Sequence, residues 1–201
     1  MKQIKNIIFD FGGVLIDWNP VYLYSKVFET EDEINYFLEN ICTYPWNVLQ
    51  DAGRSIKEAT LEKQLEHPQY KEEIGMYYGR WEEMLGGIFE ENTALVAPLK
   101  ERYNVYGLTN WSAETLPIAI ERYEFFKYLD GIVVSGDEKL VKPDLQIYKV
   151  LLDRYDINAH ESLFIDDNLA NIEAARQLGF HTIHYTPEVN LKEELQFAGV
   201  L

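Results

Sequence analysis

The sequence predicts an α/β protein: a doubly wound parallel sheet, with a small all-helical cap domain inserted after the first strand. Short, almost continuously apolar runs alternate with helical patterns from residue 94 onward, which is typical of parallel strands covered by helices on both faces. One long stretch, 18–93, instead has amphipathic helical patterns and no convincing buried strand. We therefore expect a core formed by 1–17 and 94–201, and a cap formed by 18–93.

The expected strands are short apolar runs. The first lies at 4–9 (IKNIIF), which is rich in β-branched and aromatic residues and is stopped by Gly12 and Gly13. Runs of the same kind, each followed by polar or turn residues, predict four more strands at 105–108, 131–134, 162–165 and 181–185. A sheet of parallel strands is therefore expected.

Two core helices are expected between these strands. One covers 143–155, with Pro143 in the first turn, where a missing N–H costs nothing. The other covers 169–178 and ends before Gly179, because glycine is the residue that most often terminates a helix. The cap helices are indicated by stretches such as YLYSKVF and EDEINYFLENI.

The composition excludes several classes of partner. A formal net charge of −16 repels nucleic acid and anionic membrane, which bind clustered Lys and Arg. No stretch approaches the ~20 apolar residues of a membrane span, and Asp10 and Asp17 interrupt the apolar N-terminal run, unlike a secretory signal. Cys42 is the only cysteine, which favours a reducing compartment. We expect a cytoplasmic monomer or homodimer that acts on a small molecule.

Polar side chains cluster at one edge of the predicted sheet. In open parallel sheets, ligands bind beyond the carboxyl ends of the strands. The segments that reach this edge carry a hydroxyl, an amide, an ammonium and three carboxylates: Asp10, Thr109, Asn110, Lys142, Asp166 and Asp167. Each residue alone could be a turn or cap residue, but the adjacent pair Asp166 and Asp167 repel each other unless a cation or a donor lies between them.

Four segments that carry these residues resemble, in order, the motifs of the haloacid dehalogenase superfamily. They are FDFGGVLID, GLTNWS, VKPD and FIDDNLANI. The resemblance covers about 1–17 and 94–186, the helical insertion resembles the cap of that family, and the stretch IDWNP is similar to a phosphatase-like branch. It implies a hydrolase that acts on small phosphate esters, with sugar phosphates as a guess for the substrate.

The resemblance also implies roles for the residues at this edge. Asp10 would be the nucleophile and form an aspartyl phosphate, a known covalent route for a carboxylate. Thr109 and the backbone N–H of Asn110 would hold phosphoryl oxygens, with Gly12 beside them. Lys142 would stabilise Asp10 and the transferring group as a point charge.

A magnesium ion is implied as the cofactor. Asp166 would bind Mg²⁺ directly and Asp167 directly or through water, with Asp10 and the backbone carbonyl of Gly12 as further ligands. This hard ion prefers oxygen ligands and keeps several waters. Such a cation would also explain how an acidic protein holds an anionic substrate.

Gly12 departs from the family pattern, because phosphatases of this family usually carry an acid at that position. General acid–base catalysis typically contributes ~10²–10⁴-fold, so slow turnover of ordinary esters is expected unless Asp17 or a cap residue donates the proton. Two alternatives stay open. One is a 2-haloacid dehalogenase, which the acidic pair Asp166 and Asp167 argues against, and the other is a catalytically degenerate protein that binds phosphorylated metabolites.

Four residues are candidates for substrate contact: Trp18, Asn19, Arg54 and Trp111. The alternative for Trp18 and Trp111 is ordinary packing between cap and core, which is the favoured interpretation of the two. The spacing of Ser55 and Glu58 matches a capping box, so Arg54 precedes a helix. Its guanidinium either lies at the surface or points into the cleft.

Overall fold

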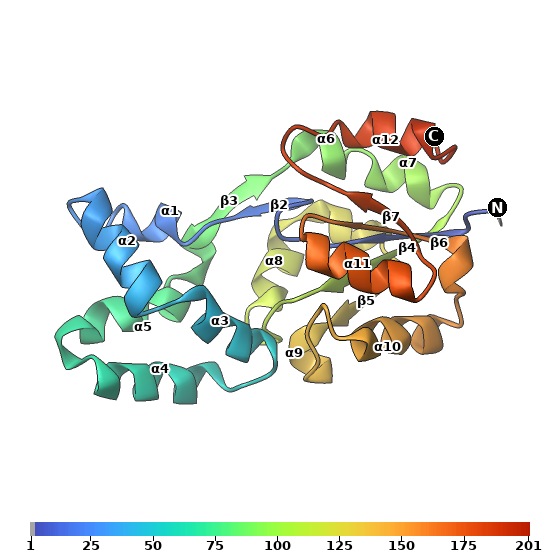
Figure 1. Cartoon of the computed structure of the whole chain (residues 1–201). Helices are drawn as coiled ribbons and strands as arrows, with labels where there is room; N and C mark the ends of the chain where they lie inside the picture. Colours follow the sequence, from blue (N-terminus) through green and yellow to red (C-terminus); the bar gives the residue numbers. More distant parts are fainter. Residues whose placement is uncertain (1–2) are drawn as a thin grey trace.

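The computed structural model describes residues 3–201, so the first two residues of the expected segment 1–17 lie outside it. At its centre is a five-stranded sheet of order β5-β4-β1-β6-β7, in which every neighbouring pair is parallel (Figure 1). The strands are β1 (Asn6–Phe9), β4 (Asn104–Thr109), β5 (Gly131–Val134), β6 (Ser162–Asp166) and β7 (His181–His184). The predicted fold class is confirmed, and all five strands lie within two residues of their expected bounds.

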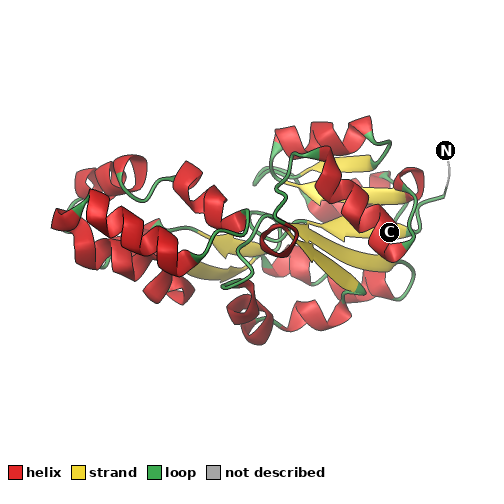
Figure 2. Cartoon of the chain, turned by 90° about the horizontal axis from the view of Figure 1, so that it is seen from below, coloured by secondary structure: helices red, strands yellow, loops and turns green. Residues whose placement is uncertain are grey.

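Alternate side chains of the strands pack against different helices. Ile8 and Phe164 belong to the apolar cluster under α10 (Leu145–Tyr155) and α11 (Leu169–Gln177). Ile7 and Ile165 belong to the cluster on the other face, which is covered by α6 (Glu90–Thr93), α7 (Val96–Lys100), α8 (Leu116–Arg122), η3 (Glu124–Tyr128) and α12 (Leu191–Phe197). Figure 2 shows the sheet between the two helical layers. Burial on both faces explains why the strands are apolar throughout.

The two predicted core helices are present, with small differences at their ends. The first begins at Leu145 rather than at Pro143, because the side chain of Asp144 accepts a hydrogen bond from the backbone N–H of Gln146 and caps the helix there. The second ends at Gln177, and Gly179 follows with a φ of +90°, a conformation that glycine adopts without a steric cost. Short helices α9 (Ser135–Glu138) and η4 (Ala159–Glu161) complete the core.

Residues 21–84, within the stretch between β1 and β4, form a lobe of helices beside the sheet (Figure 1). It contains α1 (Val21–Tyr24), α2 (Glu31–Asn40), α3 (Tyr44–Asp51), α4 (Ile56–Glu66), η1 (Pro68–Tyr70), α5 (Lys71–Gly79) and η2 (Trp81–Met84). Its interior is largely aromatic, with Tyr24 and Phe37 ring centroids 4.6 Å apart and Trp46 and Tyr77 centroids 5.2 Å apart. A division of the chain at residues 18 and 93 remains a proposal.

A two-stranded antiparallel ribbon, which no pattern in the sequence indicates, joins this lobe to the core. It pairs β2 (Ile16–Trp18) with β3 (Leu85–Ile88). Both strands are short, and the second has two glycines in the sequence LGGI, so neither shows the apolar pattern of a strand. Their pairing is created by the tertiary structure. No helix within residues 3–201 has the length and apolar character needed to cross a membrane.

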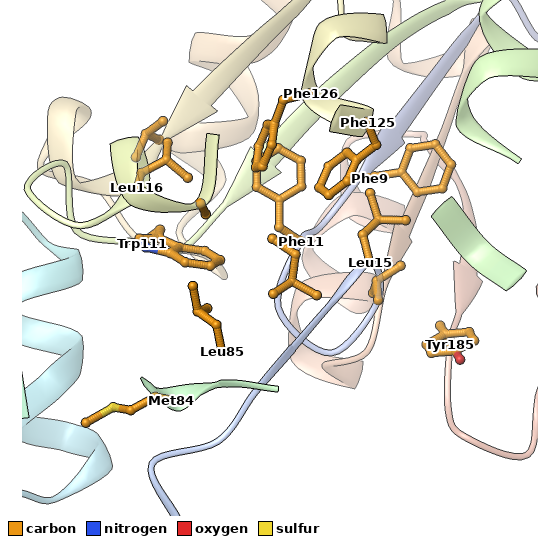
Figure 3. Close-up of a cluster of buried hydrophobic side chains, with 14 of the residues drawn as sticks. Phe9, Phe11, Leu15, Met84, Leu85, Trp111, Leu116, Phe125, Phe126 and Tyr185 are labelled. Carbon is orange, nitrogen blue, oxygen red and sulfur yellow. The ribbon is translucent and has the colours of Figure 1, made fainter. Parts of the chain in front are cut away.

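An aromatic cluster lies beneath the junction of lobe and sheet (Figure 3). Phe11 packs edge-on against Phe126, with centroids 4.9 Å apart, and the indole of Trp111 lies nearby, close to Leu85 of the ribbon. Gly107 of β4 makes room for Phe11, because a Cβ there would lie 2.2 Å from the phenyl ring. The backbone that follows β1 is therefore held tightly against the sheet.

Candidate active site

The polar groups expected at the carboxyl edge of the sheet do meet there. Asp10 follows β1, Thr109 is the last residue of β4, and Asp166 is the last residue of β6. Beside them is a cavity of about 560 Å³ between the core and the helical lobe. From the core it is lined by Asp10, Gly12, Gly13, Asn110, Trp111, Lys142, Asp167 and Asn171, among others, and from the lobe by Tyr44, Asn47, Val48, Asp51 and Trp81.

Lys142 is the charged centre of this site, and its side chain is fully buried. Its Nζ lies 3.0 Å from Oδ2 of Asp10 and 2.6 Å from Oδ2 of Asp166, and it donates a third hydrogen bond to the carbonyl of Leu108 at 2.9 Å. Burial lowers the pKa of Lys142, but the charges of Asp10 and Asp166 outweigh it, and the pKa lies above its ordinary value. The ammonium therefore stays charged and links two carboxylates.

The backbone of Lys142 is fixed by the side chain of Asn110. The amide nitrogen of Asn110 donates to the carbonyl of Lys142 at 3.0 Å, and its amide oxygen accepts from the backbone N–H of Lys142 at 2.8 Å. The two hydrogen bonds connect the loop after β4 to the loop before α10. They hold in place the backbone from which the Lys142 side chain extends.

Asp10 is oriented from its own loop. Its Oδ1 accepts a hydrogen bond of 2.7 Å from the backbone N–H of Phe11, which leaves Oδ2 to Lys142. Burial raises the pKa of Asp10 to about 7; Lys142 opposes this shift, while Asp166 and Asp167 add to it. A nearby cation therefore favours the ionised form of Asp10.

Three carboxylates surround one point. One oxygen from each of Asp10, Asp166 and Asp167 lies within 4.8 Å of the others, at positions that suit a bound cation. Asp166 is held by the amide of Asn171, at 2.9 Å and 3.1 Å from its two oxygens, and by the backbone N–H of Asn168 at 2.8 Å. This all-oxygen donor set fits a hard divalent ion such as Mg²⁺.

Three tryptophans, Trp18, Trp81 and Trp111, also line the cavity. The ring centroids of Trp18 and Trp81 lie 5.4 Å apart, and those of Trp81 and Trp111 lie 6.4 Å apart. The indole N–H of Trp111 donates to Thr115 Oγ1 at 3.0 Å. The buried indole nitrogens of Trp18 and Trp81, in contrast, have no hydrogen-bond partner among residues 3–201.

A model of the family described as haloacid dehalogenase-like hydrolases matches residues 7–185. The chain belongs to this family. Among its relatives, a sesquiterpene phosphatase, astK, from Aspergillus oryzae is 28% identical over 96% of this chain and 95% of its own length. A D-ribitol-5-phosphate phosphatase from Bacteroides thetaiotaomicron is 22% identical over 96% of this chain and 97% of its own length.

The fold of this haloacid dehalogenase-like hydrolase is also found in solved structures. A crystal structure of a family enzyme from Bacteroides thetaiotaomicron, in a magnesium complex, superimposes with a TM-score of 0.79, at 21% identity over 97% of this chain and 100% of that one. Together with the family match, the relatives identify the protein as a hydrolase of the phosphatase-like branch.

Some candidate residues of the hydrolase do not reach the cavity. Arg54 does precede helix α4, where Ser55 accepts from the backbone N–H of Glu58, but it forms an ion pair with Glu62 and is not among the described residues that line the cavity. Asn19 accepts from the backbone N–H of Val21 instead. Thr109 is almost fully buried at the end of its strand and is not among the described residues that line the cavity.

Other residues of the site were not found by sequence reasoning. Asn171, which holds Asp166, lies in the segment FIDDNLANI. Its place in that motif could have indicated that it belongs to the site. Tyr44, Asn47 and Asp51 come from the cap helix α3, whose sequence YPWNVLQD resembles an ordinary amphipathic helix. Only the packing of lobe on core brings them to the cavity.

Proposed function

We propose that this hydrolase is a magnesium-dependent phosphatase of small phosphorylated metabolites, with Asp10 as the nucleophile. The observation that carries the proposal is the position of Lys142, which bridges Asp10 and Asp166 with distances of 3.0 Å and 2.6 Å beside a third carboxylate, Asp167. An ammonium and a candidate cation site next to one carboxylate suit a reaction in which that carboxylate attacks an anionic phosphoryl group.

Each of several core residues has a role in the first step, the transfer of the phosphoryl group to Asp10. Oδ2 of Asp10 attacks phosphorus, while Oδ1 is occupied by the N–H of Phe11. Lys142 favours the ionised form of Asp10 and offers positive charge to the transferring phosphoryl oxygens, and Thr109 with the backbone N–H of Asn110 is proposed to bind the remaining oxygens. A Mg²⁺ ion held by Asp10, Asp166, Asp167 and the carbonyl of Gly12 would neutralise the carboxylates and the phosphate together.

The wall of the cavity favours a hydroxylated organic group. From the lobe, the cavity is lined by the polar side chains of Tyr44 and Asp51, and the tryptophans Trp18 and Trp81 also line it. Hydroxyl groups of a sugar or polyol can form hydrogen bonds with the phenol and the carboxyl, while the aromatic rings cover the C–H groups. The two relatives act on a terpenoid and a polyol phosphate, respectively, and these polar groups support the polyol or sugar class.

The dehalogenase alternative lacks comparable support. Such an enzyme needs a cation for the substrate carboxylate and no acidic pair. Here the pair is present, and Asn171 and Asn168 hold Asp166 in position beside the candidate cation site. Halide release from 2-chloropropionate in the presence of EDTA would support that alternative.

The test is phosphate release from a panel of sugar, polyol and farnesyl monophosphates with Mg²⁺, using the parent protein and Asp10→Asn. We expect Asp10→Asn to abolish release with an unchanged circular dichroism spectrum. The matched control is Asp17→Asn, because Asp17 comes from the same segment but accepts from Tyr22 outside the cavity. Turnover retained by Asp10→Asn would contradict the proposal.

A further inference from the structure

The cavity contains few groups that could give a proton to a leaving oxygen. Its ionisable lining residues, within the described part of the chain, are Asp10, Tyr44, Asp51, Lys142 and Asp167. Asp10 is the proposed nucleophile, Lys142 already donates to three acceptors, and Asp167 belongs to the carboxylate cluster. Gly12 lines the same cavity and offers no side chain. Tyr44 and Asp51 therefore remain as the candidate proton donors.

Asp51 is a buried carboxyl with no cationic partner. It is 8% exposed, and the ion pairs within residues 3–201 do not include it. Its neighbours are hydrogen-bond donors: the amide of Asn47 donates to Oδ2 at 3.1 Å, and the backbone N–H of Ser112 also donates to the carboxyl. Tyr78 fixes the orientation of Asn47 by donating to its amide oxygen at 2.9 Å. The position of the carboxyl in the cavity wall is thus determined from both lobe and core.

The geometry of phosphoryl transfer places the leaving group on the same side as this residue. The attacking and leaving oxygens lie roughly in line through phosphorus. Asp10 attacks from the sheet edge, so the leaving oxygen points away from the sheet, toward the lobe that supplies α3. We propose that Asp51 is the general acid of the first step and the general base of the second. This inference rests on the proposed function.

The two steps balance as follows. An oxygen of Asp10 forms a bond to phosphorus, the bond from phosphorus to the ester oxygen breaks, and the proton of the Asp51 carboxyl moves to that oxygen to give the alcohol. A water molecule then attacks phosphorus from the position that the alcohol has left, and Asp51 takes its proton. The P–O bond to Asp10 breaks, inorganic phosphate leaves, and Asp51 is again protonated.

The surroundings of Asp51 suit both roles near neutral pH. Burial raises its pKa to about 7, and the hydrogen bond from Ser112 opposes the shift only in part. The titratable side chains that face it are Tyr44 on its own helix and Tyr77 and Tyr78 on α5; burial raises the pKa of each, so they stay neutral. Tyr44 is 63% exposed and is the weaker acid of the two candidates.

The experiment compares kcat/KM for aryl and alkyl phosphates in the parent and in Asp51→Asn. Asparagine can still accept from Ser112 but cannot donate a carboxyl proton. We expect a loss of about 10²- to 10⁴-fold for alkyl phosphates such as glycerol 3-phosphate, and a much smaller loss for 4-nitrophenyl phosphate, whose leaving group needs no proton. The matched control is Asp32→Asn, which removes an exposed carboxylate from α2 of the same lobe.

The dependence on leaving-group pKa distinguishes catalysis from packing. The slope of log kcat/KM against that pKa should be shallow in the parent and steep in Asp51→Asn, and the decrease of parent activity above pH of about 7 should vanish in the variant. An equal loss for all esters, or no loss, would overturn the inference. If Asp51→Asn does not fold, the parent alone still tests the inference: a steep slope of log kcat/KM against leaving-group pKa in the parent would overturn it.

Failure of the proposed function gives a different pattern. A parent protein that releases phosphate from no ester, or an Asp10→Asn variant that keeps its turnover, contradicts the phosphatase itself. If turnover depends on Asp10 but the slope is the same in the parent and in Asp51→Asn, only the role of Asp51 is contradicted.

Discussion

The side chain of Asn110 holds the backbone of Lys142 through two hydrogen bonds, of 3.0 Å and 2.8 Å, that use both ends of its amide. Asn110 and Lys142 belong to different loops, so this pair connects the end of β4 with the start of the α10 region. The ammonium that bridges Asp10 and Asp166 depends on that connection.

Asn110→Ala should therefore lower kcat by displacing Lys142, even though the ammonium itself is intact. Each lost hydrogen bond costs about 0.5–1.5 kcal/mol, so we expect a decrease of roughly tenfold to a hundredfold. Asn104→Ala is the matched control, because Asn104 lies at the opposite end of β4 and donates to Asn6. Equal kinetics of Asn110→Ala and the parent would show that Lys142 is positioned by its buried ion pairs alone.

Removal of the metal should remove activity. We expect EDTA to stop phosphate release and Mg²⁺ to restore it, because the single charge of Lys142 does not balance the carboxylates of Asp10, Asp166 and Asp167 together with an anionic phosphate. Asp166→Asn should raise the Mg²⁺ concentration needed for half-maximal activity, and calorimetric titration with Mg²⁺ alone measures the same loss without turnover. Asp153→Asn, an exposed carboxylate on α10, is the control. Full activity in EDTA would contradict the metal site.

Gly13 leaves room for the Asp167 carboxylate. A Cβ at Gly13 would lie 2.2 Å from Oδ2 of Asp167, so Gly13→Ala should displace that carboxylate and weaken Mg²⁺ activation. Gly199→Ala is a closely matched control, because its φ of +71° is close to the +73° of Gly13 but nothing lies within 4 Å of the added methyl group. Both variants carry a backbone cost of about 1–2 kcal/mol, and only Gly13→Ala should change the response to Mg²⁺.

The buried Asp51 should make stability depend on pH. Its pKa is raised from 3.8 to about 7 in the folded protein, so between these values the folded state holds a proton that the unfolded chain has lost. Stability then falls as pH rises through this range, by up to roughly 4 kcal/mol in total. Asp51→Asn should become more stable relative to the parent as pH increases from 5 to 8 in urea unfolding. A pH-independent difference would show that Asp51 is ionised at little cost.

The sheet and the cluster of polar groups at its carboxyl edge could be predicted because both depend on local sequence. Strands buried on two faces are apolar throughout, and Asp10, Asp166 and Lys142 follow from short motifs in a fixed order. The ribbon of β2 and β3 could not be predicted, because strands of three and four residues with adjacent glycines have no pattern of their own.

The residues that the lobe contributes to the site were harder to predict, because their contacts are also created by tertiary packing and leave no local pattern. Asp51 meets Ser112 only because α3 packs on the core, and no local signal marks that contact. Arg54 looked suitable as a cation at a helix start, yet a carboxylate on the same helix, Glu62, pairs with it. Sequence patterns identify which side chains are charged, but which charges meet is decided by packing between distant segments.

The ribbon of β2 and β3 has a mechanical consequence. The two chain crossings between lobe and core run side by side in it, so any tilt of the lobe relative to the sheet would bend this one narrow connection. The ribbon contains a register shift at Asp17 and Trp18 and the adjacent glycines Gly86 and Gly87. Trp18, whose indole lines the cavity, lies on this hinge, so any opening of the lobe also moves a wall of the binding site.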